Sequence, residues 1–142
     1  MGRKYAREST MKLLYQMEIN SDFSENAINI FFENNIFNEG EKAYIKDAIQ
    51  TIIDNMKTID SYIKDNIEGW KLNRLARVDL STLRIAIYEI LFRKDIPVEV
   101  SINEAIEIAK KYSTEESSKF INGVLGGFVR SRDEIWLNIM LV

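Results

Sequence analysis

The sequence predicts an all-α protein, on three observations. Its 142 residues include one proline and six glycines, too few for the many turns of a β protein. Apolar residues recur at i, i+3, i+4 and i+7 over most of the chain, the spacing that gives a helix one buried face. No repeat, low-complexity tract or linker divides the chain, whose length suits one compact domain. We therefore expect about seven helices in a single domain over residues 1–142.

The N-terminal half is predicted to contain four helices, over residues 4–19, 24–35, 41–56 and 58–66. Ser24 has the hydroxyl that caps the second helix. Gly40 marks a break before the third helix, which has the most regular amphipathic pattern of the chain. Gly69 ends the fourth helix.

The C-terminal half is predicted to contain three more helices, over residues 79–92, 101–112 and 114–130. The first of these is apolar on nearly every side, which is typical of a helix at the centre of a fold. Pro97 requires extended backbone before the next helix, and Ser101 with Glu104 has the spacing of a capping box that would start it. Thr114, followed by two glutamates, predicts the start of the last helix.

The end of the chain carries two opposing signals. Gly126 and Gly127 each weaken a helix by about 1 kcal/mol relative to alanine, so we expect the last helix to end or bend there. Residues 135–142 form an apolar tail, which either packs on the body or leaves an exposed patch.

Missing residue types exclude whole classes of chemistry. Without cysteine the chain has no disulfide, thiolate ligand or cysteine nucleophile, and without histidine it lacks the commonest general base and metal ligand. The glycines at 123–127 lack the lysine and hydroxyl residue of a phosphate-binding loop. Pairs of glutamates such as Glu104 and Glu107 fit helix caps and solvated surface better than a reaction site. We therefore expect no catalytic residues, metal or cofactor.

The same sequence predicts a protein of the cytoplasm without membrane attachment. The basic start is not followed by an apolar stretch, as a secretion signal requires. Nowhere does the chain approach the roughly 18 uninterrupted apolar residues of a membrane span.

Charge is unevenly distributed, although the formal net charge is only −3. Residues 1–7 hold three bases and no acid, residues 20–69 hold ten acids against four bases, and residues 70–94 hold six bases against two acids. Tyr5 among the N-terminal cations, and Phe120 beside Lys119, Lys110 and Lys111, are basic and aromatic pairings that suit RNA. A solvated tail and a core phenylalanine would give the same patterns, so residue types by themselves indicate only a helical binding module.

Ordered motifs along nearly the whole chain add a resemblance. They are Ala6-Arg7 with Leu14-Tyr15, the segment Leu83 to Glu89, Pro97, the segment Ile102 to Lys110, and the segment Lys119 to Leu125. In this order and spacing they are similar to those of the NusB family. The resemblance implies an all-α fold of two small perpendicular helical bundles that share one core. It also implies a transcription antitermination factor that binds boxA RNA with the ribosomal protein NusE and joins RNA polymerase on ribosomal RNA operons.

Site residues follow from the same resemblance. The RNA-binding residues fall on the N-terminal stretch, on helix-1 tyrosine Tyr15 and on the last helix, namely Arg3, Lys4, Arg7, Tyr15, Glu116, Lys119 and Phe120. The cations would neutralise phosphates, and Phe120 would stack on an unpaired base. A core position for Tyr15 fits its helical spacing equally well. Asp79 and Glu89 are the candidates for the protein partner's side, with pairing of Glu89 to Arg84 or Arg93 as the alternative.

Some features depart from the family pattern or stay open. Tyr5 interrupts the arginine-rich start, which predicts that RNA binding depends on the protein partner. Asn122 and Gly123 match the family, and we expect them to serve close helix packing. Relatives are seen as monomers or dimers, so a homodimer stays open. Two other hypotheses are a NusB-like RNA-binding domain of the kind fused to ribosomal RNA cytosine methyltransferases, and a structural interaction protein that never touches RNA.

Overall fold

Helices account for all the regular structure in the described part of the chain. The structure is a computed structural model that describes residues 2–69 and 71–141, with side chains through residue 133. The elements are α1 (Arg3–Asn20), α2 (Glu25–Glu33), α3 (Glu39–Asp54), α4 (Met56–Lys64), the short 3₁₀ helix η1 (Leu72–Arg74), α5 (Arg77–Phe92), α6 (Val98–Tyr112) and α7 (Glu115–Leu141). The predicted all-α class is therefore confirmed.

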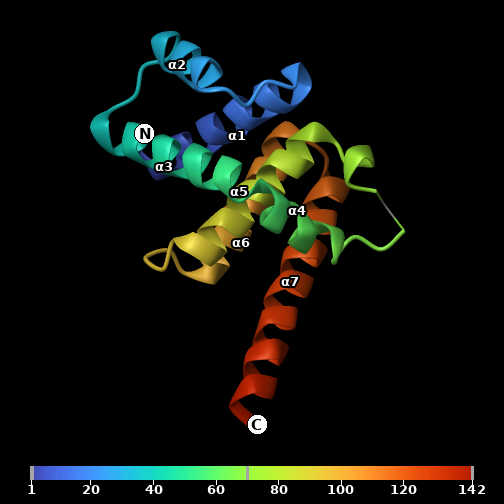
Figure 1. Ribbon diagram of the computed structural model, residues 1–142. Helices are drawn as coiled ribbons and strands as arrows, with labels where there is room; N and C mark the ends of the chain where they lie inside the picture. The colour runs from blue at the N-terminus through green and yellow to red at the C-terminus, as the bar shows by residue number, and fades with distance from the viewer. Residues whose placement is uncertain (1, 70, 142) are drawn as a thin grey trace.

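Two small bundles lie across one another and share α5 (Figure 1). On one side α1 packs against α3, with α2 covering its end, and on the other α6 packs against α7. Helix α5 contacts α1, α3, α4, α6 and α7, so one hydrophobic core is continuous through both bundles. The start of α1 and the connection between α5 and α6 lie at the same end of the molecule (Figure 1).

Helix α5 occupies the centre because it has almost no polar side to expose. Every residue from Ser81 to Ile90 is buried, and Leu83 and Ile87 have no exposed surface. Burying a leucine or isoleucine side chain contributes about 1.5–3 kcal/mol relative to leaving it exposed. The prediction of a central buried helix is confirmed.

The starts of α2 and α3 follow their capping residues. The Ser24 hydroxyl accepts the backbone N–H of Ala27 at 3.2 Å, as predicted. The third helix begins at Glu39, two residues before the predicted start, because Asn38 and Glu41 form a reciprocal capping box. Gly40 therefore lies inside the first turn of α3 instead of breaking the chain before it.

The predicted capping box of Ser101 and Glu104 is wrong. Pro97, with extended backbone (φ −59°, ψ 141°), directly precedes α6, so the helix begins at Val98 and both residues lie within it. Their side chains are consequently free to reach other helices, which they do in the cluster described below.

The glycines of α7 do not end the helix, which continues to Leu141. A Cβ atom on Gly127 would lie 2.6 Å from Oδ1 of Asn66, so this glycine permits α7 to approach the segment that follows α4 closely. A Cβ atom on Gly123 would meet nothing within 4 Å, and Asn122 beside it is exposed. The close packing expected at Asn122 and Gly123 is therefore found at Gly127.

The apolar tail over residues 135–142 continues α7 as backbone helix through Leu141, away from the body of the protein (Figure 1). The packing of its side chains, which the sequence left as two alternatives, lies outside the described residues. Among the helices that the structure describes, none has the length and hydrophobicity needed to cross a membrane.

Candidate nucleic-acid interface

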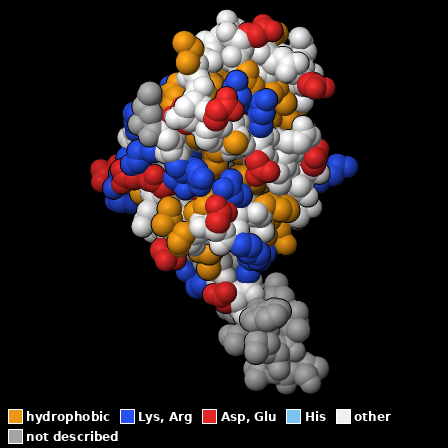
Figure 2. Space-filling view, turned by 90° about the vertical axis from the view of Figure 1, so that its left-hand side faces the viewer, with side chains coloured by type: hydrophobic (Ala, Val, Ile, Leu, Met, Phe, Trp, Pro, Cys, Tyr) orange, Lys and Arg blue, Asp and Glu red, His pale blue; other side chains and the backbone are white. Residues whose placement is uncertain are grey.

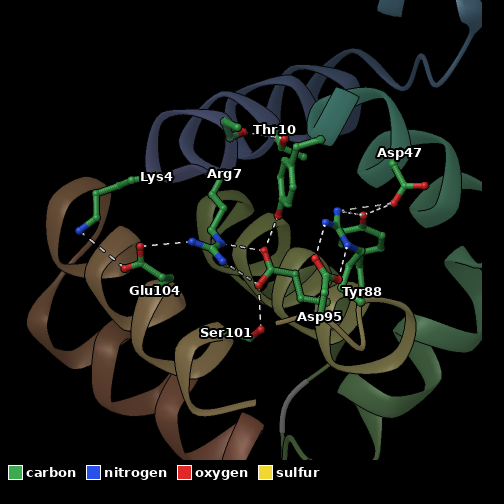
Figure 3. Close-up of polar contacts among 12 residues, drawn as sticks. Lys4, Arg7, Thr10, Asp47, Tyr88, Asp95, Ser101 and Glu104 are labelled. Carbon is green, nitrogen blue, oxygen red and sulfur yellow. Dashed lines mark hydrogen bonds and ion pairs between the residues drawn. The ribbon is translucent and has the colours of Figure 1, made fainter. Parts of the chain in front are cut away.

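The candidate interface has two ends of different structure. The first end, at the start of α1, contains a buried ionic cluster. The Arg7 guanidinium donates to both carboxylate oxygens of Glu89, at 2.7 and 3.3 Å, and to Glu104 at 3.3 Å. Glu89 also accepts from the Ser101 hydroxyl at 2.7 Å and from the Tyr44 hydroxyl. We call Arg7, Tyr44, Glu89 and Ser101 the Glu89 cluster (Figure 3). It joins α1, α3, α5 and α6 at one point.

Burial gives this cluster its electrostatic character. Glu89 is 1% exposed and Arg7 is 6% exposed. Burial by itself would lower the pKa of Arg7, but the hydrogen bond and the charge of Glu89 outweigh it and raise that pKa. Burial, with the charge and hydrogen bond of Glu89, raises the pKa of the Tyr44 phenol well above its ordinary value. These shifts keep Arg7 charged and Tyr44 neutral beside the Glu89 side chain.

The Glu89 cluster changes two of the predicted roles. Glu89 is buried and bonds within the protein, which leaves it little surface for the protein partner that the sequence predicted for it. The alternative prediction, that Glu89 pairs with Arg84 or Arg93, is wrong. Arg84 pairs with Glu18 and Asp60, and Arg93 pairs with Asp95. Arg7, predicted to contact RNA, has its donors taken by two carboxylates and keeps little surface for a phosphate.

Arg3 and Lys4 remain on the surface beside this cluster. Lys4 lies 3.6 Å from Glu104, with 68% of its side chain exposed (Figure 3). Arg3 is exposed and its guanidinium lies 5.0 Å from the centre of the Tyr44 ring, within cation–π range. Both therefore present positive charge at the start of α1, as predicted.

Arg93 adds a fixed guanidinium at the same end of the molecule. Asp95 accepts two hydrogen bonds from it, each 2.9 Å long, and the Tyr88 hydroxyl donates to Asp47 nearby (Figure 3). The hydrogen bond from Arg93 lowers the pKa of Asp95 to about 2, so this pair stays charged at any physiological pH. Lys and Arg side chains gather in the middle of the face that holds the start of α1, with Asp and Glu side chains around them (Figure 2).

The other end of the interface is a groove between α5 and α7. It encloses about 350 Å³ and is lined by Arg74, Leu75, Ala76, Asp79, Thr114, Glu116, Ser117 and Phe120. The structure thus brings together the predicted residues Asp79, Glu116 and Phe120. Phe120 is half-buried and rests on the core, while Lys119 and Glu116 are exposed.

Asp79 is an incompletely bonded carboxylate in this groove. It is 6% exposed, and its Oδ2 atom accepts from the Ser117 hydroxyl at 2.8 Å. Its Oδ1 atom is buried and has no hydrogen-bond partner. An unpaired buried acceptor is costly, so this position favours a ligand that supplies a donor.

Along α1, a strip of exposed and half-buried side chains runs from the first end toward the second. Lys4, Glu8, Lys12 and Tyr15 follow one another at helical spacing, and Tyr15 is 39% exposed, so it is not the core residue of the alternative prediction. The strip continues onto α6 through Lys111, which donates to Glu8 at 2.9 Å. We call Lys4, Glu8, Lys12, Tyr15, Lys111 and Tyr112 the α1 strip.

Sequence reasoning missed Lys12 and Tyr112. The helical spacing from Lys4 to Tyr15 was a sufficient signal for Lys12. The contact between Lys12 and Tyr112 joins two helices a hundred residues apart in the chain, and no local pattern indicates it.

Fold and surface together define a class: a small all-α protein with cations and aromatic rings on one exposed face, which suits single-stranded nucleic acid. Among the described residues, no three acidic side chains gather closely enough to hold a metal ion.

Comparisons with known proteins identify the family. A model described as the NusB family matches residues 4–130. The transcription antitermination protein NusB of Acetivibrio thermocellus is 49% identical over 130 residues, which cover 92% of this chain and 90% of that protein. The chain belongs to the NusB family.

Solved structures give the same result for the fold. NusB of T. maritima has a TM-score of 0.83 and 41% identity, and the match covers 92% of this chain and 93% of that one. A structure of the antitermination factors NusB and NusE in complex with dsRNA contains a chain with a TM-score of 0.79 and 28% identity, covering 91% of this chain and 96% of that one.

Proposed function

We propose that this protein is a transcription antitermination factor that binds boxA RNA together with the ribosomal protein NusE. The observation that carries the proposal is the match to antitermination proteins over 92% of the chain, combined with a basic and aromatic face on the same fold. A relative of this fold is known in complex with NusE and RNA. The protein acts by binding, without catalysis, and works in the cytoplasm as part of the RNA polymerase elongation complex.

RNA contacts are assigned to the exposed residues of the interface. Arg3, Lys4 and Lys119 neutralise phosphates, and Phe120 and Tyr15 offer ring surface to unpaired bases. Glu116, exposed beside the Phe120 groove, accepts hydrogen bonds from base edges. Arg7 serves the site indirectly, since its bonds to Glu89 and Glu104 fix the helix turn that carries Lys4.

The protein partner is assigned to the groove at Asp79. Its unpaired Oδ1 atom accepts a donor from NusE, which removes the cost of an unsatisfied buried acceptor. Because the groove also contains Phe120, RNA and NusE meet at one place, and each raises the affinity for the other.

The test is binding of a boxA RNA oligonucleotide and a scrambled oligonucleotide, with and without purified NusE, over a series of salt concentrations. We expect preference for boxA, tighter binding with NusE, and affinity that falls with salt as counterions are released. Equal affinity for both oligonucleotides under all conditions contradicts the proposal.

An Asp79→Asn variant tests the partner's side separately. We expect it to weaken the NusE-dependent gain in affinity and to leave binding of the protein to RNA in the absence of NusE unchanged. An unaltered NusE-dependent gain would contradict the role assigned to Asp79.

The methyltransferase-linked hypothesis has less support. The relative from Acetivibrio thermocellus is itself an antitermination protein, covered over 90% of its own length. A purely structural role is the other outcome of the boxA experiment.

A further inference from the structure

Two groups of the proposed RNA contacts lie toward the two ends of the α1 strip, and Tyr15 lies on the strip itself. Arg3 and Lys4 lie at the start of α1, whereas Lys119 and Phe120 lie on α7. The exposed surface of α1 with the C-terminal turn of α6 lies between them, since Lys4 adjoins Glu104 of α6 and α7 starts three residues after Tyr112. An RNA strand that reaches both groups has to cross this middle section.

The middle section contains a tyrosine ring that two ammonium groups approach. The Nζ atoms of Lys12 and Lys111 each lie 5.3 Å from the centre of the Tyr112 ring. The two lysines come from different helices, α1 and α6, and both are exposed. The ring attracts both cations and so places two positive charges at one aromatic side chain. Fixed neighbouring cations of this kind suit an RNA phosphate.

The two lysines differ in what neutralises them. Lys111 donates to both oxygens of Glu8, at 2.9 and 3.2 Å, and this hydrogen bond raises its pKa. No carboxylate in the described part of the chain lies within 4.0 Å of the Lys12 ammonium group. Lys12 is thus the cation available to a ligand, and Glu8 is a negative charge that reduces the attraction of the strip for phosphate.

We propose that Lys12, Tyr112 and Lys111 form a further RNA contact that carries one backbone phosphate between the two ends of the interface. The inference rests on the proposed function, because it concerns the same RNA. Lys12 binds the phosphate directly, Tyr112 holds the two ammonium groups in place, and Glu8 weakens the contact by neutralising Lys111.

The experiment measures binding of the boxA oligonucleotide to the full chain with NusE present, over a salt series. Each phosphate contact to a single strand contributes about 0.7 to the slope of log affinity against log salt. We expect Lys12→Gln to lower the affinity about three-fold at low salt and to reduce the slope by about 0.7. Lys57→Gln, at an exposed lysine of α4, is the matched control and leaves both quantities unchanged.

Two further variants separate RNA contact from a structural role. Glu8→Gln frees the charge of Lys111, so it increases the affinity and the salt slope while removing an ion pair from the folded protein. Tyr112→Phe keeps the ring and behaves like wild type, whereas Tyr112→Leu lowers the affinity as Lys12→Gln does.

The inference is overturned if wild type binds boxA RNA but Lys12→Gln has the wild-type slope, or if Glu8→Gln weakens binding. If wild type shows no preference for boxA over the scrambled oligonucleotide, the proposed function itself has failed, and the two failures are thereby distinguished.

Discussion

Arg7 and Lys4 lie one turn apart on the same helix, but Arg7 is buried and Lys4 is exposed. Arg7 is enclosed in the Glu89 cluster, with its guanidinium bound by two carboxylates. Lys4 approaches one of the same carboxylates, that of Glu104, from outside and keeps 68% of its side chain in solvent. The first residue stabilises the fold, and the second is available to a ligand.

The difference teaches that the position of a cation relative to buried carboxylates decides its role. Breaking a buried ion pair leaves an uncompensated charge in the interior and is strongly destabilising, whereas an exposed pair contributes little. Perturbing the Glu89 cluster should therefore affect stability first, and perturbing the α1 strip should affect RNA binding first.

The largest expected effect comes from Glu89→Ala. It leaves Arg7 buried without its main partner and removes the acceptor of the Tyr44 and Ser101 hydroxyls, so the free energy of unfolding should fall by about 3–5 kcal/mol. Urea denaturation measures this change in the free energy of unfolding. The double variant Arg7→Met with Glu89→Leu should recover much of the loss. A single variant as stable as wild type would refute the structural role of the cluster.

Phe120→Ala tests the opposite end of the interface. Loss of base stacking should weaken boxA binding by about 1–3 kcal/mol. Because Phe120 is only half-buried against the core, the change in unfolding free energy should be smaller than for Glu89→Ala. Anisotropy titrations with labelled RNA and urea denaturation measure the two quantities. A stability loss that matches that of Glu89→Ala would place the ring with the core residues instead.

The stability that the Glu89 cluster contributes should depend on pH in the alkaline range, because the cluster contains Tyr44. The folded protein raises the pKa of Tyr44 above its unfolded value near 10, so the stability from keeping the phenol protonated is complete below pH 10 and lost as pH rises above it. Unfolding free energies measured from pH 8 to 11.5 should fall by up to about 1.4 kcal/mol per pH unit from this group. The Tyr44→Phe variant should be less stable than wild type at pH 8, but its unfolding free energy should fall less steeply above pH 10. If the unfolding free energies of wild type and Tyr44→Phe fell in parallel with pH, the assignment of this pH dependence to Tyr44 would be contradicted.

The smallest stability effect is expected for Lys4→Gln. An exposed ion pair contributes at most about 1 kcal/mol, so the unfolding free energy should change little. The salt slope of boxA binding should nevertheless decrease by about 0.7. The comparison with Arg7 would lose its basis if Lys4→Gln destabilised the protein as strongly as loss of Glu89 does.

Local sequence patterns were sufficient for most of the fold. The caps at Ser24 and Thr114, and the nearly all-apolar helix α5, were predicted because each depends on residues within one or two turns. The prediction of a helix start was wrong where a side chain could either cap a helix or bond to another helix. Ser101 and Glu104 have capping-box spacing, yet Pro97 starts α6 earlier and both side chains bond to other helices.

By itself, then, the sequence determined the all-α class, the central helix and a basic N-terminal end, because periodicity, capping and composition act over short distances. Only the tertiary structure decided which cations are buried and which are exposed. Arg7 meets Glu89 across 82 residues of chain, and Lys12 meets the ring of Tyr112 across a hundred. Such contacts depend on how the bundles pack, and packing depends on the whole core at once.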